Sequence, residues 1–233
     1  TIGFNEDGQT LGVLHGRSGA PDTYYIMEVH QGTYTGPGTV YDAATGTIRG
    51  GSGTTEPQPA GDQPSNWAKA QVEEAVAAGI VPESLQSKYT QAATRAEFCA
   101  LAVQLYETVT GSEITERATF SDTTDVNVQK MAGLGVVNGV GDGKFDPNGT
   151  LTREQAATIL VRLADAMGHP LPAAAPTFAD NASISSWARD AVGRVKAGGI
   201  MDGVGSNTFN PKAAYSREQS ILTILRLYQF TQS

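Results

Sequence analysis

The chain has 233 residues, of which 39% are hydrophobic and 17% are charged, and its formal net charge is −8. These fractions are typical of a globular protein with a buried core. The negative charge argues against DNA or RNA as a partner, because nucleic-acid binders concentrate Lys and Arg to neutralise phosphates. No apolar stretch reaches the ~18 residues of a membrane span, and the first residues do not form a signal peptide. We therefore expect no membrane partner, and a chain that begins inside a longer protein.

Residues 1–49 are rich in Gly, Thr and Tyr and include the partly alternating stretch Tyr24-Tyr25-Ile26-Met27-Glu28-Val29-His30. This alternation, with the turn signal Thr35-Gly36-Pro37-Gly38, predicts a short β segment. The segment has too few large apolar residues for a core of its own, so we expect it to be the tail of an upstream module or to pack on the next part of the chain. Residues 50–61, rich in Gly, Thr and Pro, are predicted to be a linker.

A four-residue pattern occurs three times after the linker: Thr94-Arg95-Ala96-Glu97, Thr152-Arg153-Glu154-Gln155 and Ser216-Arg217-Glu218-Gln219. Each copy places Ser or Thr three residues before Glu or Gln and opens an apolar run, the pattern of a capping box that begins a helix. Capping does not explain the Arg, because a cation in the first turn opposes the helix macrodipole. We expect an anion at each helix start, held by the Arg and the free backbone N–H groups together.

A shorter helix is predicted before each box. It opens at Trp67 in the first copy and at Trp187 in the third, whereas the second has Thr123 at that place. The glycines predicted to end these helices are Gly79, Gly135 and Gly199. The repeat defines three predicted units, residues 62–118, 119–176 and 177–233. Because the longer helices are apolar over much of their circumference, we expect the three helix-loop-helix repeats to bury them together around a common axis.

Other patterns predict no further chemistry. Asp142, Asp146 and Asn148 fall at ligand positions of an EF-hand-like loop, but Lys144 takes the third position and Arg153 the twelfth, where a bidentate Glu is needed. We therefore expect a Gly-rich turn and no metal.

Catalysis is not predicted either. The three histidines have no partner at metal-ligand or triad spacing, and no Gly-x-Ser-x-Gly or His-Glu-x-x-His motif occurs. The single cysteine, Cys99, lies in an apolar run and is predicted to be a buried, unreactive thiol. We expect no catalytic residue and no cofactor.

In its repeated features the chain resembles the S-layer homology family. The resemblance is carried by the three boxes, the Trp-Ala that opens the short helix, Phe120-Ser121-Asp122 and Phe178-Ala179-Asp180, and the loop Gly141-Asp142-Gly143-Lys144-Phe145-Asp146-Pro147. It covers residues 62–233 and implies a mainly α monomer of three repeats in a pseudo-threefold arrangement, preceded here by the small β segment. The grooves between units would bind a secondary cell-wall polymer bearing pyruvylated N-acetylmannosamine. Such a protein is secreted and located at the cell wall of a Gram-positive-type bacterium.

The resemblance also implies which residues bind the ligand. The box Arg would meet the acidic ketal, the Trp would face the sugar, and the loop Gly would let the sugar approach the backbone. The predicted ligand-binding residues are Arg95, Arg153, Arg217, Trp67, Trp187, Gly139, Gly203, Asp122 and Asp180. Two alternatives stay open: the Arg stems could instead cover apolar neighbours, and each Trp could equally be a core anchor.

Within one unit, Arg217 alone has the Trp, the Gly and the Asp, so we expect the third unit to hold the most complete set unless grooves draw residues from neighbouring units. The function implied is non-catalytic anchoring to the cell wall. The alternatives are the anchoring end of a cell-surface glycoside hydrolase, a structural surface-layer lattice protein, and a protein-interaction scaffold.

Overall fold

The computed structural model describes residues 63–232 and, within residues 2–50, the backbone of six strands. The chain divides into two compact units, Thr1–Pro59 and Ala60–Ser233. The second unit is mainly helical, as predicted. The predicted linker, residues 50–61, lies outside the described residues except for Gly50.

The strands described in residues 2–50 form two three-stranded antiparallel sheets, each in chain order. They are β1 (Ile2–Phe4), β2 (Thr10–His15), β3 (Thr23–Glu28), β4 (Thr33–Gly36), β5 (Thr39–Asp42) and β6 (Thr47–Gly50). The alternating stretch predicted from Tyr24 to His30 falls on β3, which pairs with β2 so that Leu11 lies opposite Met27. Val29, His30, Pro37 and Gly38 lie outside the described residues.

Short and long helices alternate along residues 63–232. The described α-helices are α1 (Lys69–Ala77), α2 (Arg95–Thr110), α3 (Val126–Gly133), α4 (Arg153–Ala166), α5 (Arg189–Ala197) and α6 (Arg217–Thr231). Three 3-10 turns accompany them, η1 (Glu83–Leu85), η2 (Asn181–Ser183) and η3 (Ser186–Ala188). None of the helices in the described part of the chain is long and apolar enough to cross a membrane.

The capping boxes begin the long helices where the sequence predicts them. In α2 the hydroxyl of Thr94 accepts from the N–H of Glu97, whose carboxylate accepts from the N–H of Thr94, and the reciprocal pair is present in α4 and α6 as well. The short helices end at the predicted glycines, because Gly79, Gly135 and Gly199 adopt φ values of 71°, 74° and 70° that other residues rarely adopt. Both predictions are confirmed.

The segments just before the three boxes close a ring of backbone hydrogen bonds. The N–H of Ala93 donates to the carbonyl of Tyr215 at 2.8 Å, Tyr215 donates to Leu151 at 2.9 Å, and Leu151 donates back to Ala93 at 3.0 Å. Leu151, Tyr215 and Ala93 are all buried. Each predicted unit therefore bonds to both others through one short extended segment.

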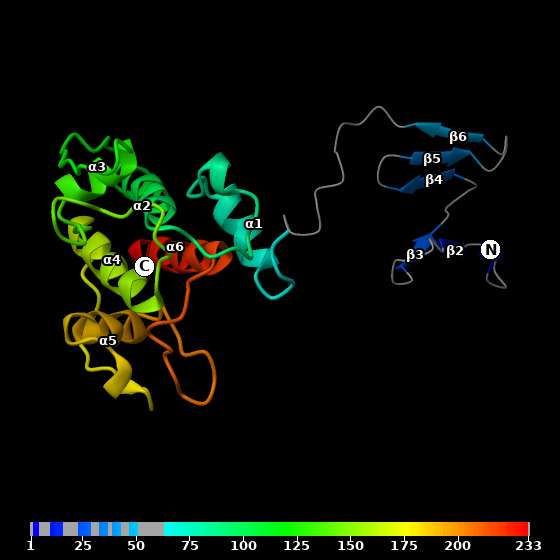
Figure 1. Ribbon diagram of the computed structural model, residues 1–233. Coiled ribbons are helices and arrows are strands. Elements are labelled where there is room, and N and C mark those ends of the chain that lie inside the picture. The colour runs from blue at the N-terminus through cyan, green and yellow to red at the C-terminus, as the bar shows by residue number, and fades with distance from the viewer. Residues whose placement is uncertain are drawn as a thin grey trace. The chain divides into compact units, whose positions relative to one another are not determined.

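Helix packing has the same cyclic order. The long helices α2, α4 and α6 contact one another, and each also contacts the short helix of the next predicted unit: α2 with α3, α4 with α5, and α6 with α1. Figure 1 shows the short helices around the outside of the long ones. The long helices contribute much of the core, including Phe98, Leu101, Leu160, Leu163, Ile221 and Ile224. Burying such helices on several sides is what their apolar circumference requires.

Candidate ligand-binding grooves

The box arginines are buried, and their side chains donate hydrogen bonds to the neighbouring unit. Arg95 at the start of α2 is 8% exposed, and its Nε donates to the carbonyl of Phe145 while Nη2 donates to that of Asn138, both at 2.9 Å. Its guanidinium carbon lies 4.3 Å from the centre of the Phe145 ring. This arrangement combines two charge-assisted hydrogen bonds with a cation–π contact.

Arg153 at the start of α4 repeats the arrangement one unit later. Its Nε and Nη2 donate to the carbonyls of Phe209 and Asp202 at 2.7 Å, and its guanidinium lies 4.8 Å from the Phe209 ring. Burial lowers the pKa of both Arg95 and Arg153 from the ordinary value, yet arginine stays charged at neutral pH. In both side chains Nη1 has no hydrogen-bond acceptor among residues 63–232. One cationic donor therefore remains for a ligand.

The backbone N–H groups at the helix starts are already occupied. The N–H of each box Arg donates to a carbonyl of the next predicted unit. These bonds run from Arg95 to Gly149, from Arg153 to Ala213 and from Arg217 to Gln91, at 3.0, 3.1 and 2.8 Å. The following residue in each box donates to the carbonyl of Pro147, Pro211 or Tyr89. The expectation that free N–H groups of the helix start hold an anion is therefore wrong, because neighbouring backbone has taken them.

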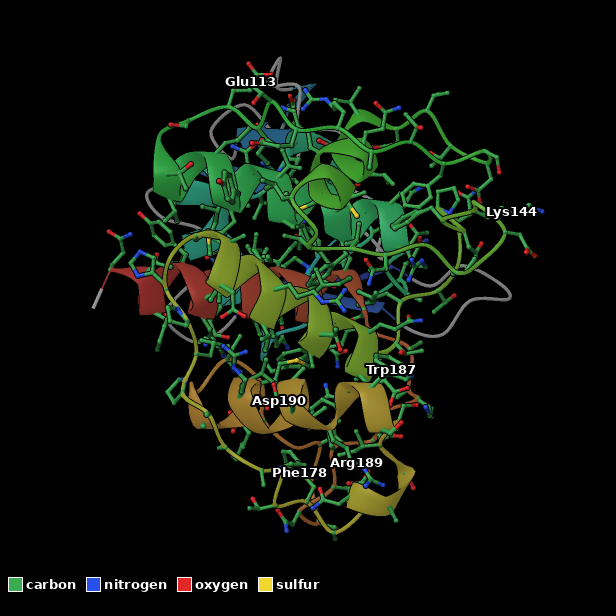
Figure 2. The ribbon with its side chains drawn as sticks, turned by 90° about the vertical axis from the view of Figure 1, so that its left-hand side faces the viewer. Glu113, Lys144, Phe178, Trp187, Arg189 and Asp190 are labelled. Atoms are coloured by element: carbon green, nitrogen blue, oxygen red, sulfur yellow. The ribbon has the colours of Figure 1, made fainter. Side chains whose placement is uncertain are left out.

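A cavity of about 300 Å³, here called the first groove, is assembled from three predicted units. Arg95 comes from the first, and the loop Val137 to Val140 with the polar face of α4 comes from the second. Trp187, which precedes α5, comes from the third. Figure 2 shows Trp187 at the start of α5, beside α4. The structure thus brings together Arg95, Gly139 and Trp187 of the predicted site residues.

A second cavity of about 170 Å³, here called the second groove, has the same composition. Its Arg comes from the second predicted unit, its loop and helix face from the third, and its Trp from the first. Its predicted site residues are Arg153, Gly203 and Trp67. The grooves thus draw residues from neighbouring units, which is the exception under which a complete set within the third unit was not expected. Each groove takes its Arg from one unit, its loop from the next, and its Trp from the one after that, which the sequence of a single unit cannot show.

Three polar residues of the long helices line each groove and were not predicted. In α4 they are Gln155, Thr158 and Arg162, spaced so that they share one face of the helix. In α6, Gln219 and Arg226 stand at the positions of Gln155 and Arg162, and Thr223, at the position of Ile159, is the third polar residue that lines the second groove. Arg226 also donates to the carbonyl of Ile200 at 3.3 Å and lies 3.8 Å from the carboxylate of Asp202. The repeated Gln and Arg at matching positions is the sequence signal that would have identified them.

The two tryptophans are surface residues. Trp67 is 60% exposed and Trp187 is 56% exposed, so the alternative that they are core anchors is wrong. Val140 and Val204 at the loop tips are also more than half exposed and line the first and second groove, respectively. Each groove therefore offers an exposed indole and an aliphatic side chain next to cationic groups.

The loop glycines are required by the protein itself. A Cβ added to Gly139 would lie 2.5 Å from the carbonyl oxygen of Lys144 and 2.9 Å from the Phe120 ring. At Gly203 the nearest atom would be the carbonyl oxygen of Thr208, at 2.7 Å. Both glycines line a groove, but close packing within their own loop already accounts for the missing side chain.

Asp122 and Asp180 hold loop backbone and do not line the grooves described above. The carboxylate of Asp122 accepts from the N–H groups of Phe145 and Asp146, both at 2.8 Å. Asp180 accepts from Phe209 and Asn210 in the same way. These bonds hold the pKa of Asp122 below its ordinary value, and they outweigh desolvation to do the same for Asp180. Their hydrogen bonds fix the carbonyls of Phe145 and Phe209 that accept from the box arginines.

Arg217, the third predicted arginine, has a different environment. Its Nη2 donates to the carboxylate of Glu97 at 2.6 Å, and its Nη1 donates to the carbonyl of Ser87. Its Nε is buried without a hydrogen-bond partner in the described part of the chain. Arg217 is thus placed like the other two arginines but bound by an internal carboxylate.

Comparisons with known proteins agree with the repeat. The sequence model of the S-layer homology domain matches residues 120–157 and 177–219, which fall in the second and third predicted units. The first predicted unit lies outside both ranges.

Several known proteins are similar to this chain in sequence. The amylopullulanase of Thermoanaerobacterium thermosulfurigenes is 30% identical over 223 residues, 88% of this chain and 12% of that protein. The exoglucanase XynX of Acetivibrio thermocellus is 29% identical over 72% of this chain and 16% of its own length. The surface-layer 125 kDa protein of Lysinibacillus sphaericus is 27% identical over 70% of this chain and 14% of its own length. The first match is too long to be confined to residues 62–233.

The chain thus spans less than a fifth of the length of these relatives, and what they share with it includes most of the helical unit. The domain matches, the repeated capping boxes and the cyclic packing all fall in this unit. The chain belongs to the S-layer homology family.

Proposed function

We propose that the helical unit anchors a surface protein to the bacterial cell wall by binding an acidic, pyruvylated secondary cell-wall polysaccharide in the first and second grooves. The observation that carries the proposal is the pairing, in each groove, of a fixed guanidinium with an exposed indole. An acidic sugar presents a carboxylate and an apolar ring face, which match these two groups.

The guanidinium is fixed before any ligand arrives. In the first groove, Nε and Nη2 of Arg95 are tied to the carbonyls of Phe145 and Asn138, so Nη1 has a defined position at the groove. A carboxylate that binds there gains a charge-assisted hydrogen bond without the cost of ordering a flexible side chain. The same holds for Arg153 in the second groove.

The polar face of the long helix supplies further donors. The side-chain oxygen of Gln155 accepts from the N–H of Thr152, which leaves its amide NH₂ group for a ligand in the first groove. Arg162 adds a second cation to the same groove. Gln219 and Arg226 take the equivalent places in the second groove. The recognition chemistry is thus cationic and donor-rich, and it involves no bond making or breaking.

Two grooves on one compact unit would also allow a single polymer chain to be held at two points. Once one groove is occupied, the second encounter is intramolecular, so polymer affinity would exceed the affinity for a single sugar residue. This property suits an anchor. The relatives that are named as enzymes or as a surface-layer protein extend far beyond the region that they share with this chain.

The test is a titration of the intact chain with purified wall polymer, before and after removal of its acidic ketal. Binding should weaken at least tenfold when the ketal is removed, because the carboxylate that meets the arginine is lost. Equal affinity for the two polymers would overturn the role assigned to the arginines.

The substitution Arg162→Gln sharpens this test. Arg162 is half-buried on the face of α4, so its loss should weaken binding while the fold stays intact. Lys144→Gln is the matched control, because Lys144 is exposed at a loop tip outside both grooves. If the two substitutions changed polymer binding equally, general charge attraction would replace the proposed groove. Unchanged wall binding by the Arg162→Gln and Arg226→Gln double variant would favour a protein-interaction scaffold.

A further inference from the structure

The capping box that begins α2 differs from the other two in the residue two positions after its Arg. Gln155 and Gln219 line the first and second grooves, whereas the α2 box has Glu97 at this position. Either residue completes the capping box, because each provides a side-chain oxygen for the N–H of the capping residue. The remaining side-chain atom differs: glutamine offers a donor, and glutamate offers a charged acceptor.

Glu97 uses this acceptor to bind Arg217. One carboxylate oxygen accepts from the N–H of Thr94 at 2.9 Å, and the other accepts from Nη2 of Arg217 at 2.6 Å. The side chain of Arg217 is 8% exposed and that of Glu97 is 27% exposed, so this ion pair is largely shielded from water. Glu97 presents to Arg217 the same chemical group that an acidic ligand would present to Arg95 or Arg153.

The surroundings of Arg217 lack the features that favour an anion in the two grooves. Ser87 takes the sequence position of Phe145 and Phe209, but its carbonyl accepts from Nη1 of Arg217 and not from Nε. Among the described residues, Arg217 therefore has no cation–π contact like those of Arg95 and Arg153, and its Nε has no hydrogen-bond partner. Gln104 occupies the place of Arg162 and Arg226, and it donates to the carbonyl of Gly79.

We propose that the chain holds two acidic sugar residues, one in the first groove and one in the second, and that Glu97 closes the third position by acting as an internal carboxylate for Arg217. This inference rests on the proposed function. A ligand that displaced Glu97 would exchange one charge-assisted bond for another and would leave a partly buried carboxylate without its partner. Binding there would yield little or no net gain.

The number of acidic-sugar sites per chain tests this inference. The intact chain is titrated calorimetrically with a pyruvylated N-acetylmannosamine monosaccharide, because a single sugar residue avoids the multivalency of the polymer. Two sites per chain are expected. One or three sites would overturn the inference alone, whereas no binding at all would overturn the proposed function and the inference with it.

Two exchanges between Glu and Gln test whether Glu97 is the cause. Glu97→Gln retains the capping box and releases Arg217, so a third site should appear, at least tenfold weaker than the other two because no second Arg faces it. A count that stays at two would overturn the role of Glu97.

Gln155→Glu is the reciprocal variant and places the same carboxylate opposite Arg95. It should remove the first groove from the count and leave one site, whereas two unchanged sites would overturn the proposed closure. Thermal unfolding of both variants checks that the capping box and fold are retained.

Discussion

Ser65 and Glu218 are separated by 153 residues and joined by two hydrogen bonds. The N–H of Ser65 donates to one carboxylate oxygen of Glu218 at 2.8 Å, and its hydroxyl donates to the other at 2.9 Å. Ser185 and Glu154 repeat the pair one unit earlier, at 3.0 Å for both bonds. The acid in the second helical position therefore links α4 and α6 to the segment that opens the next short helix. In α2 this position is Ala96, so the link is absent there.

Glu218→Ala tests the link that joins the two ends of the helical unit. Glu218 is 4% exposed, and its removal leaves two donors of Ser65 without acceptors. We expect the free energy of unfolding to fall by about 1–3 kcal/mol, measured by urea denaturation. Glu73→Ala is the control, because Glu73 is exposed and makes only a 4.0 Å ion pair with Lys69; a loss as large as that of Glu218→Ala would contradict the assignment.

Local features of this fold could be predicted because they depend on neighbours in the sequence. The capping box joins Thr152 to Gln155, three residues away, and the glycine at position 135 ends α3 by its own backbone conformation. Such interactions leave fixed spacings in the sequence. The buried state of Cys99 was predictable for a similar reason, since it lies in an apolar helical run.

Contacts between units could not be predicted in the same way. Arg95 and Arg153 donate to main-chain carbonyls, and a carbonyl carries no residue identity that a sequence pattern could reveal. The composition of each groove depends on the cyclic order of the units, so Trp187 joins Arg95 and not Arg217. Asp122 was predicted to contact the ligand because the sequence does not reveal that its carboxylate accepts from backbone N–H groups.

Gly139→Ala should destabilise the protein even when no ligand is present. The new Cβ would meet the carbonyl of Lys144 at 2.5 Å and the Phe120 ring at 2.9 Å, so the loop must shift at a cost of about 1–3 kcal/mol. Thermal unfolding measures the effect, and Val140→Ala next to it, with an exposed side chain, should change stability by less than about 0.5 kcal/mol. A fully stable Gly139→Ala protein that had lost ligand binding would show that the glycine serves the ligand alone.

Trp187→Ala and Trp67→Ala should separate the two grooves. Both side chains are more than half exposed, so their removal should change the free energy of unfolding by less than about 0.5 kcal/mol. Loss of the indole should weaken binding of the acidic monosaccharide about tenfold in one groove and leave the other unchanged. The control is Val126→Ala, since Val126 is 53% exposed and lines neither groove. Weakening of both sites by one Trp substitution would mean that the grooves are not independent.

Cys99 should report on opening of the core. Burial raises the pKa of its thiol to about 12 from an ordinary value of 9.0, which lowers the thiolate fraction at pH 8 on the order of a thousandfold, and its side chain is inaccessible. A thiol reagent should therefore label the native protein far more slowly than the urea-unfolded protein. Native labelling at the rate of the unfolded chain would show that α2 opens readily.

The two loop aspartates predict how stability depends on pH. Hydrogen bonds from backbone N–H groups, chiefly that of Phe145, hold the pKa of Asp122 below its ordinary value, and the pKa of Asp180 is lowered as well. A carboxyl whose pKa is lower in the folded state binds fewer protons than in the unfolded state, so its contribution is complete above about pH 4 and is lost as the pH falls through the folded value. The midpoint temperature of thermal unfolding should therefore decrease when the pH is lowered below about 4.

Asp122→Asn isolates this contribution. At pH 7 the variant should unfold at a lower temperature than the parent, because an amide offers one acceptor where the carboxylate serves the N–H groups of both Phe145 and Asp146. Below the folded pKa of Asp122 the parent carboxyl is also neutral, so the difference between the two thermal midpoints should shrink as the pH is lowered from 5 towards 2. Asp142→Asn serves as the control, since Asp142 is exposed at the loop tip. A gap between parent and Asp122→Asn that stays constant across this range would contradict the assignment of the carboxylate as a charged clamp on the loop that receives Arg95.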